Sequence, residues 1–282
     1  MLTVRSLSIA AIALSGIIGM TGCNKTPPVE DAKAVEKTEE KVEGGHGSHS
    51  KSGHSSHSKS GSELKGEAKD VNYLVNLGLM KGHMIVAKEL LDRGKVAEAE
   101  PHIGHPVEEI YLDIEEELDD RGVPQFKDTL NGLHDLVKYK PSDPAISQEY
   151  GASIIAIDNA IAALPEEQRR SPAFVLQAIN GILDTANAEY GASISDGKFV
   201  EDIEYQDSRG FVLYVKDILY PSIEDKLAEE NPKADQKIKS ALAKLILAWP
   251  GPIPPEAPVV TASEVNAGVQ EIRETSEKAI AP

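Results

Sequence analysis

The stretch that decides the fold is residues 71–94, VNYLVNLGLMKGHMIVAKELLDRG. Apolar side chains recur in it at the three- and four-residue spacing of one helix face, at Leu74, Leu77, Met84, Leu90 and Leu91. Gly94 is a typical C-terminal stop. The sequence therefore predicts a helix from about Val71 to Arg93.

The same periodicity continues to the end of the chain and predicts an all-α domain over residues 70–282. Ala and Leu dominate its apolar residues, whereas the whole chain has four Phe and one Trp, a balance that favours helices. No run of alternating β-branched residues predicts a strand. We expect a bundle of about seven or eight helices. Their ranges are 71–93, 95–120 with a bend at 101–106, 124–139, 144–164, 172–194, 201–228, 233–248 and 263–279.

The first 22 residues have the layout of a secretory signal peptide, with Arg5 before an apolar stretch and small residues at its end. The tetrapeptide from Met20 to Cys23 resembles the lipobox of bacterial lipoproteins. The resemblance implies cleavage before Cys23 and lipidation of its thiol with diacylglycerol and palmitate-type chains. A cleaved signal with a free Cys23, or a core cysteine, is the alternative. We expect a cell-envelope protein, facing the periplasm from the outer membrane if the cell is Gram-negative.

Residues 23–69 predict a disordered tether, because Lys, Glu, Ser, Gly, His and Pro cannot bury enough surface to order the chain. The octapeptides HGSHSKSG at 46–53 and HSSHSKSG at 54–61 form a tandem repeat. Tracts of this kind can bind a transition metal through neutral imidazoles. The alternative is a spacer that gained histidines by repeat slippage. The tether histidines are His46, His49, His54 and His57.

A second set of histidines lies in the helical domain. His102, His105 and either Glu108 or Glu109 are spaced to share one helix stripe, and a short hairpin would bring His83 close to it. Imidazoles with one carboxylate suit zinc, iron or copper. Alternatively, these residues cap a helix, stabilise its first turn or pack in the core.

An acidic and tyrosine-rich group flanks the turn expected at Asp196-Gly197. Carboxylates beside tyrosines can bind a hard cation or ferric iron, and the alternative is a turn with solvated helix ends. The members of this second acidic group are Glu189, Tyr190, Asp196, Glu204, Tyr205 and Asp207. For His134, which has no such neighbours, a core or surface position is expected.

Three segments resemble known families. Residues 188–205, AEYGASISDGKFVEDIEY, resemble the periplasmic helical region of bacterial iron permeases fused to cytochrome c. Residues 82–87 and 102–111 resemble a group of bacterial envelope proteins. The pair His105-x-x-Glu108 resembles the H-x-x-E of imelysin-type iron-associated lipoproteins, although Ile103 stands where imelysins carry Gly. These resemblances imply a link to metal uptake and an envelope transporter as partner.

Several function classes are disfavoured. A formal net charge of −17 argues against nucleic acid as a ligand. The chain lacks H-E-x-x-H, G-x-S-x-G and phosphate-loop motifs, so we expect no enzyme. One cysteine excludes Cys-x-x-Cys-His haem attachment, and noncovalent haem on His83 or Met84 is the weakest hypothesis. The sequence favours a transition-metal-binding envelope lipoprotein. The alternative is a structural lipoprotein that docks a membrane partner without a ligand.

Overall fold

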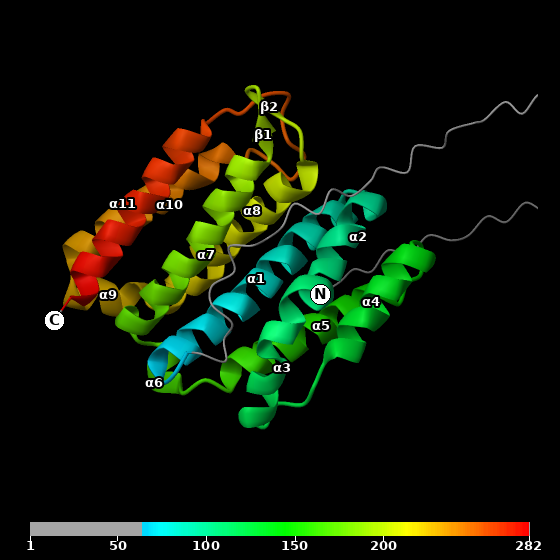
Figure 1. The fold of residues 1–282 in the computed structure, drawn as a ribbon, viewed down its shortest axis with the longest axis horizontal. Coiled ribbons are helices and arrows are strands. Elements are labelled where there is room, and N and C mark those ends of the chain that lie inside the picture. The colour runs from blue at the N-terminus through cyan, green and yellow to red at the C-terminus, as the bar shows by residue number, and fades with distance from the viewer. Residues whose placement is uncertain (1–63, 282) are drawn as a thin grey trace, which may run out of the picture. The chain divides into compact units, whose positions relative to one another are not determined.

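A computed structural model describes residues 64–281, and this part of the chain is mainly helical, as expected (Figure 1). The α-helices are α1 (Glu67–Asp92), α2 (Val96–His105), α3 (Tyr111–Asp120), α4 (Lys127–Tyr139), α5 (Ile146–Ala162), α6 (Glu166–Arg169), α7 (Pro172–Ala192), α8 (Asp202–Tyr214), α9 (Glu224–Glu230), α10 (Pro232–Leu245) and α11 (Ala262–Ile280). The π-helical turns are η2 (Pro106–Ile110) and η3 (Val215–Leu219), and the 3-10 turns are η4 (Tyr220–Ser222) and η5 (Ile246–Ala248).

Local signals in the sequence set several helix ends. Gly94, at a φ of +72°, ends α1 as predicted. Ser171 caps α7, where its side chain accepts a hydrogen bond from the Phe174 backbone N–H. Thr261 and Glu264 form a reciprocal capping box at the start of α11. α1 begins at Glu67, earlier than expected, because its first turn is polar and lacks the apolar periodicity used for the prediction.

α1 is the central helix of the domain. It packs against α7 and α8 on one side and against α2 and α5 on the other (Figure 1). Its buried positions lie all round the helix and include the polar residues Asn76, Lys81 and His83. Outside this layer, α11 packs on α7 and α10, and α4 packs on α2 and α5. None of the helices in the described residues is both long and apolar enough to cross a bilayer.

Two of the differences from the predicted helices lie at prolines. The expected single helix over 201–228 is interrupted near Pro221, which has no N–H and whose ring crowds the carbonyl of the preceding turn. In the second segment the α-helix continues through Pro101 and changes to a π-helical turn at Pro106. The wider turn η2 begins at Pro106, and the wider turn η3 ends two residues before Pro221.

The expected turn at Asp196-Gly197 forms a small hairpin, which the helical interpretation did not include. Both residues have positive φ, as the tightest hairpin turns require. They join β1 (Ile194–Ser195) to β2 (Lys198–Phe199), which pair antiparallel with Ile194 opposite Phe199.

Candidate metal centre

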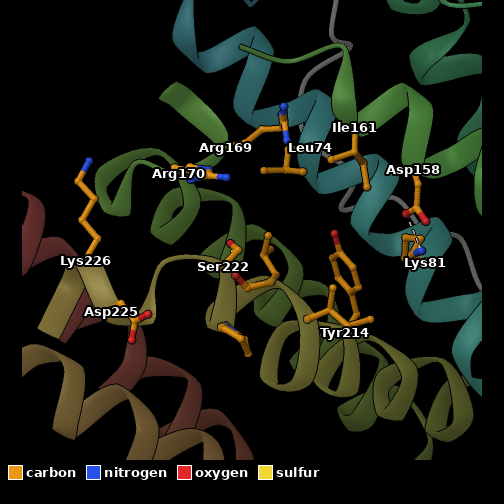
Figure 2. A pocket seen from close by; sticks show the side chains of 13 residues that line it. Leu74, Lys81, Asp158, Ile161, Arg169, Arg170, Tyr214, Ser222, Asp225 and Lys226 are labelled. Atoms are coloured by element: carbon orange, nitrogen blue, oxygen red, sulfur yellow. Dashed lines mark hydrogen bonds and ion pairs between the residues drawn. The ribbon is translucent and has the colours of Figure 1, made fainter. Parts of the chain in front are cut away.

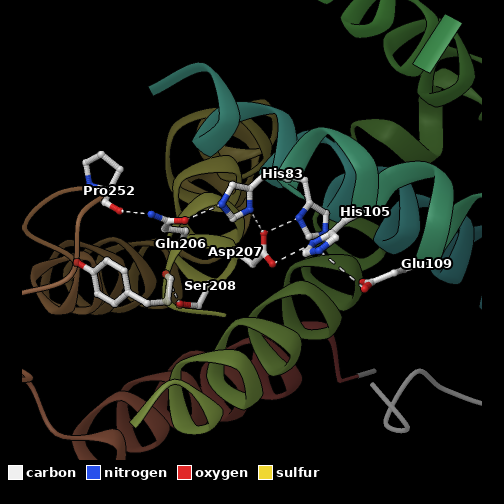
Figure 3. A network of polar contacts seen from close by, with 9 residues as sticks. His83, His105, Glu109, Gln206, Asp207, Ser208 and Pro252 are labelled. Carbon is white, nitrogen blue, oxygen red and sulfur yellow. Dashed lines mark hydrogen bonds and ion pairs between the residues drawn. The ribbon is translucent and has the colours of Figure 1, made fainter. Parts of the chain in front are cut away.

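Three imidazoles and one carboxylate from three helices meet in the interior (Figure 3). α1 supplies His83, α2 supplies His102 and His105, and α8 supplies Asp207. One ligand atom from each side chain lies within 4.8 Å of all the others, and the described residues contain no second group of this kind. The structure therefore brings the three histidines together, and the acid among them is Asp207. We call these four residues the histidine–aspartate cluster.

Two glycines let α1 and α8 approach closely enough to form the cluster. Gly82 precedes His83, and Gly210 lies about one helical turn after Asp207. A Cβ atom at Gly210 would lie 2.2 Å from the carbonyl oxygen of Gly82. A Cβ atom at Gly82 would lie 2.9 Å from the backbone nitrogen of Phe211. Backbone atoms cannot rotate away, so a side chain at Gly210 would force the helices apart.

The Asp207 carboxylate holds two imidazoles on one oxygen. Its Oδ1 atom lies 2.6 Å from Nδ1 of His83 and 2.7 Å from Nδ1 of His102. All three side chains are buried. Solvent therefore cannot substitute for these contacts, and the buried charge depends on its imidazole partners.

Gln206 fixes the proton on the other ring nitrogen of His102. The Pro252 carbonyl can only accept, so the amide nitrogen of Gln206 donates to it at 3.0 Å. The amide oxygen consequently faces His102, and Nε2 of that ring donates to it at 2.7 Å. In a neutral imidazole this leaves a lone pair on Nδ1, aimed at the Asp207 carboxylate. Because two lone pairs repel at 2.7 Å, a proton or a metal cation has to lie between them.

His105 contributes a buried nitrogen without a hydrogen-bond partner among the described residues. Its Nδ1 atom lies 3.2 Å from Oδ2 of Asp207, close enough for charge attraction but without the alignment of a hydrogen bond. Buried nitrogens normally have a partner. A cation coordinated by both His105 and Asp207 would supply one.

Burial and mutual charge shift the pKa values in the cluster. Burial alone would raise the pKa of Asp207, but the three facing imidazoles hold it well below its ordinary value. Burial lowers the pKa of His83, against the opposing effect of Asp207. Burial acts in the same direction on His105 but is outweighed by Asp207, with Glu109 and Glu108, and its pKa is raised to about 9. Near neutral pH the carboxylate is therefore ionised, whereas His105 has to lose a proton before it can coordinate a metal.

A small cavity adjoins the cluster on the side of His83 and Asp207. Its volume is about 10 Å³, room for about one water molecule. Glu109 and Glu189 line it together with Phe211, whose ring packs edge-on against His83 at a centroid distance of 4.9 Å. The cluster therefore has acidic side chains and an apolar wall next to it.

The two glutamates expected on the histidine stripe lie apart from the converging ligand atoms. The nearer one is Glu109, whose Oε1 atom is 4.0 Å from Nε2 of His105. Glu108 lies toward Gly104, beside His134. Both glutamates belong to the π-helical turn η2. Its wider winding rotates them away from the positions that α-helical spacing predicts.

The second acidic group is not gathered into one site in the described residues. The hydroxyl of Tyr190 donates to the Val260 carbonyl at 2.6 Å, and that of Tyr205 donates to the Gly251 carbonyl at 2.9 Å. These tyrosines therefore attach the segment before α11 to α7 and α8. Asp196 lies in the hairpin turn.

The remaining members of that group are divided between the cluster and a helix end. Asp207 belongs to the cluster, and Glu189 lines the adjoining cavity. Glu204 lies in the first turn of α8. The sequence interpretation assigned Asp207 to a different site from the histidines, and this was wrong. The contact between Asp207 and the histidines depends on how the helices pack, which the sequence pattern does not show.

His134 has a polar partner that its own helix does not reveal. Its Nε2 atom lies 2.7 Å from Oε1 of Glu100 on α2, and Lys138 approaches the same oxygen at 2.9 Å. Its own helix could not show this contact, because Glu100 lies 34 residues earlier in the chain. His134 lies outside the histidine–aspartate cluster.

The predictions for the N-terminal part of the chain lie outside the described residues. They concern the signal peptide at residues 1–22, lipidation at Cys23 and the tether histidines His46, His49, His54 and His57. No structural observation tests them, and they stay predictions.

Gln206 is the residue of this site that the sequence interpretation missed. Its role depends on a carbonyl 46 residues further along the chain. The sequence does indicate that another helix packs closely against this part of the chain. Ser208 and Gly210 follow within the same helix, and small residues there favour close approach of a second backbone.

Comparison with known families gives a match over the C-terminal part of the chain. Residues 165–282 match the model of the iron permease-associated 4-helix bundle domain. This range contains Gln206 and Asp207, whereas His83, His102 and His105 precede it. No curated protein and no solved structure matches the chain. The expected resemblance to an iron permease helical region is confirmed, and the resemblance to imelysin stays a prediction.

Proposed function

We propose that the histidine–aspartate cluster binds one first-row transition metal ion and that the chain serves an envelope metal permease. The observation that carries this proposal is the orientation of His102. Gln206 holds a proton on its Nε2 atom, so Nδ1 faces the Asp207 carboxylate. Metal-binding histidines commonly donate their second N–H to a carbonyl in this way. The Nδ1 atom of His105, which faces Oδ2 of Asp207 at 3.2 Å without forming a hydrogen bond, supports the same conclusion.

The donor set has the chemistry of a site for zinc, iron or copper. It offers three imidazole nitrogens and one carboxylate oxygen. Bonds of about 2.1 Å in a tetrahedral site place ligand atoms about 3.4 Å apart. The ligand atoms now lie within 4.8 Å of one another, so small side-chain movements suffice. A ring nitrogen has to be free of its proton to coordinate the ion, so binding is expected to release protons.

The family match supports a role in uptake. Its domain is associated with iron permeases, and the matched range contributes Asp207 to the cluster. The metal ion is then cargo, and the strongly acidic chain attracts cations to its surface. A lipid anchor at Cys23 would keep the protein at the membrane of its partner.

Calorimetry with Zn²⁺, Cu²⁺ and Fe²⁺ tests metal binding. The reference protein carries serine in place of the four tether histidines, so that only the folded site is titrated. We expect one ion per chain, with an affinity at least about 100-fold weaker in Asp207→Asn, which keeps the side-chain shape. His102→Ala is expected to weaken it similarly, whereas His134→Ala, which removes a histidine outside the cluster, is expected to leave it unchanged.

Two results would contradict the proposal. Equal binding by Asp207→Asn and the reference protein would place the ion elsewhere. An absence of binding by all three ions would favour the alternative, a structural lipoprotein that docks a membrane partner. Affinity alone does not identify the physiological ion, because copper binds most sites of this type more tightly than iron. Metal analysis of protein purified from its native membrane identifies it.

A further inference from the structure

A second and larger pocket lies away from the histidine–aspartate cluster (Figure 2). Its walls come from α1, α5, the α6 region, the end of α8, the turns that lead to α9 and the start of α9. Its volume of about 570 Å³ is in the range of pockets that bind small molecules. None of the residues assigned to the metal centre lines it.

One part of this pocket is apolar. Leu74 from α1, Ile161 from α5 and Leu219 from η3 contribute to the wall. Ile218 also lines it and has 47% of its surface exposed, one of the larger exposed apolar side chains of the described residues. A ligand with an apolar body would remove this surface from water, at about 25 cal/mol for each Å² buried.

The charge of the pocket is opposite to that of the chain. Four cationic and two acidic side chains line it, so the local balance is positive in a protein whose formal charge is −17. The cationic residues are Lys81, Arg169, Arg170 and Lys226, and the acidic residues are Asp158 and Asp225. A positive pocket in an acidic protein favours an anionic ligand.

The cations at one end have exposed carboxylate partners or none. Arg169 uses its Nε–H to donate to the Leu164 carbonyl, and no described residue accepts from its terminal nitrogens. Arg170 pairs with Glu166 at 3.1 Å and Lys226 with Glu230 at 3.9 Å, and all four side chains are more than half exposed. Exposed pairs of this type contribute at most about 1 kcal/mol and exchange readily for another anion.

Two buried donors lie deeper in the pocket. Lys81, whose side chain is 9% exposed, donates to Asp158 at 2.7 Å. Tyr214 is 2% exposed and also lines the pocket. Figure 2 shows its hydroxyl turned into the pocket. The deep part of the pocket is therefore lined by one paired ammonium group and one hydroxyl as well as by apolar side chains.

We propose that this pocket binds a small organic anion with an apolar body, such as a medium-chain carboxylate. The carboxylate lies at the end formed by Arg169, Arg170 and Lys226. The apolar body lies over Leu74 and Ile161. This site is independent of metal binding.

Fluorescence titration of the full chain with 8-anilinonaphthalene-1-sulfonate, an apolar aryl sulfonate, tests the proposal. Decanoate competes for the bound probe, and decanol provides a neutral competitor of the same chain length. We expect decanoate to displace the probe at a concentration at least tenfold lower than decanol. The double variant Arg169→Gln/Arg170→Gln is expected to weaken decanoate binding at least tenfold. The matched double variant Lys237→Gln/Lys278→Gln removes the same charge outside the pocket and is expected to leave it unchanged.

A third variant keeps the test independent of folding effects at the arginines. Ile218→Glu places a negative charge on the half-exposed wall and is expected to abolish decanoate binding while the melting temperature is retained. Equal displacement by decanoate and decanol would overturn the proposal, as would equal effects of the two double variants. Binding to anionic phospholipid vesicles without binding to free decanoate would replace it with a lipid-surface contact.

Discussion

Replacing Gly210 by alanine tests whether close backbone approach builds the metal centre. The added Cβ atom would lie 2.2 Å from the Gly82 carbonyl oxygen. An ordinary contact between carbon and oxygen is about 1 Å longer. Neither atom belongs to a side chain that can change rotamer, so α1 and α8 have to separate by about that distance.

The expected loss of stability follows from two opposing terms. Overpacking of a core costs about 1–3 kcal/mol, and this contact belongs at the upper end because backbone meets backbone. Alanine recovers up to about 1 kcal/mol of helix propensity. We therefore expect Gly210→Ala to lose about 2 kcal/mol, a fall of about 4–8 °C in melting temperature for a domain of this size. Zn²⁺ affinity falls with it, because Asp207 moves away from His83.

Gly151→Ala is the matched control, because it lies inside α5 and an added Cβ would meet nothing within 4 Å. We expect this variant to gain up to about 1 kcal/mol. Urea unfolding followed by circular dichroism, together with zinc calorimetry, measures both effects. If Gly210→Ala were as stable as Gly151→Ala and bound zinc normally, the proposed role of the glycine contact would be refuted.

Three further predictions concern protons, the amide support and the metal itself. Between pH 6.5 and 9 the stability of the metal-free protein falls as pH rises, by up to about 3 kcal/mol, because folded His105 keeps a proton that the unfolded chain has lost. His83, with its lowered pKa, is neutral in the folded protein over this range and does not add to this loss. Urea titrations in EDTA measure this dependence of the unfolding free energy on pH, and His105→Gln is expected to remove it. Zinc affinity is expected to rise with pH in the same range. Gln206→Leu is expected to weaken zinc binding by about 10–100-fold in calorimetry, whereas Gln177→Leu on the surface of α7 leaves it unchanged. Zinc at 100 times its Kd is expected to add about 2.7 kcal/mol of stability, measured as a shift in the urea midpoint that EDTA reverses.

The features predicted correctly from the sequence depend on local chemistry. Helix class follows from apolar periodicity, and the ends at Gly94, Ser171 and Pro232 follow from residues that act on their own turn. The convergence of the histidines was partly accessible, because a hairpin between α1 and α2 is the simplest connection for such a short loop.

The rest of the site depends on packing between distant segments. His83 and Asp207 are 124 residues apart in the chain, and their contact depends on two glycines that no periodicity relates to each other. The π-helical turn after His105 also has no counterpart in patterns based on α-helical spacing, and it changes the direction of Glu108 and Glu109.

The metal-ligating residues of the cluster come from both sides of residue 165, where the family-matched range begins. A fragment limited to the family-matched range would keep the carboxylate but lose every imidazole of the cluster. An ion bound to the histidine–aspartate cluster would cross-link α1 and α2, which precede the matched range, to α8, which lies within it. A bound ion would therefore oppose separation of α1 and α2 from α8 and add to the stability of the folded domain.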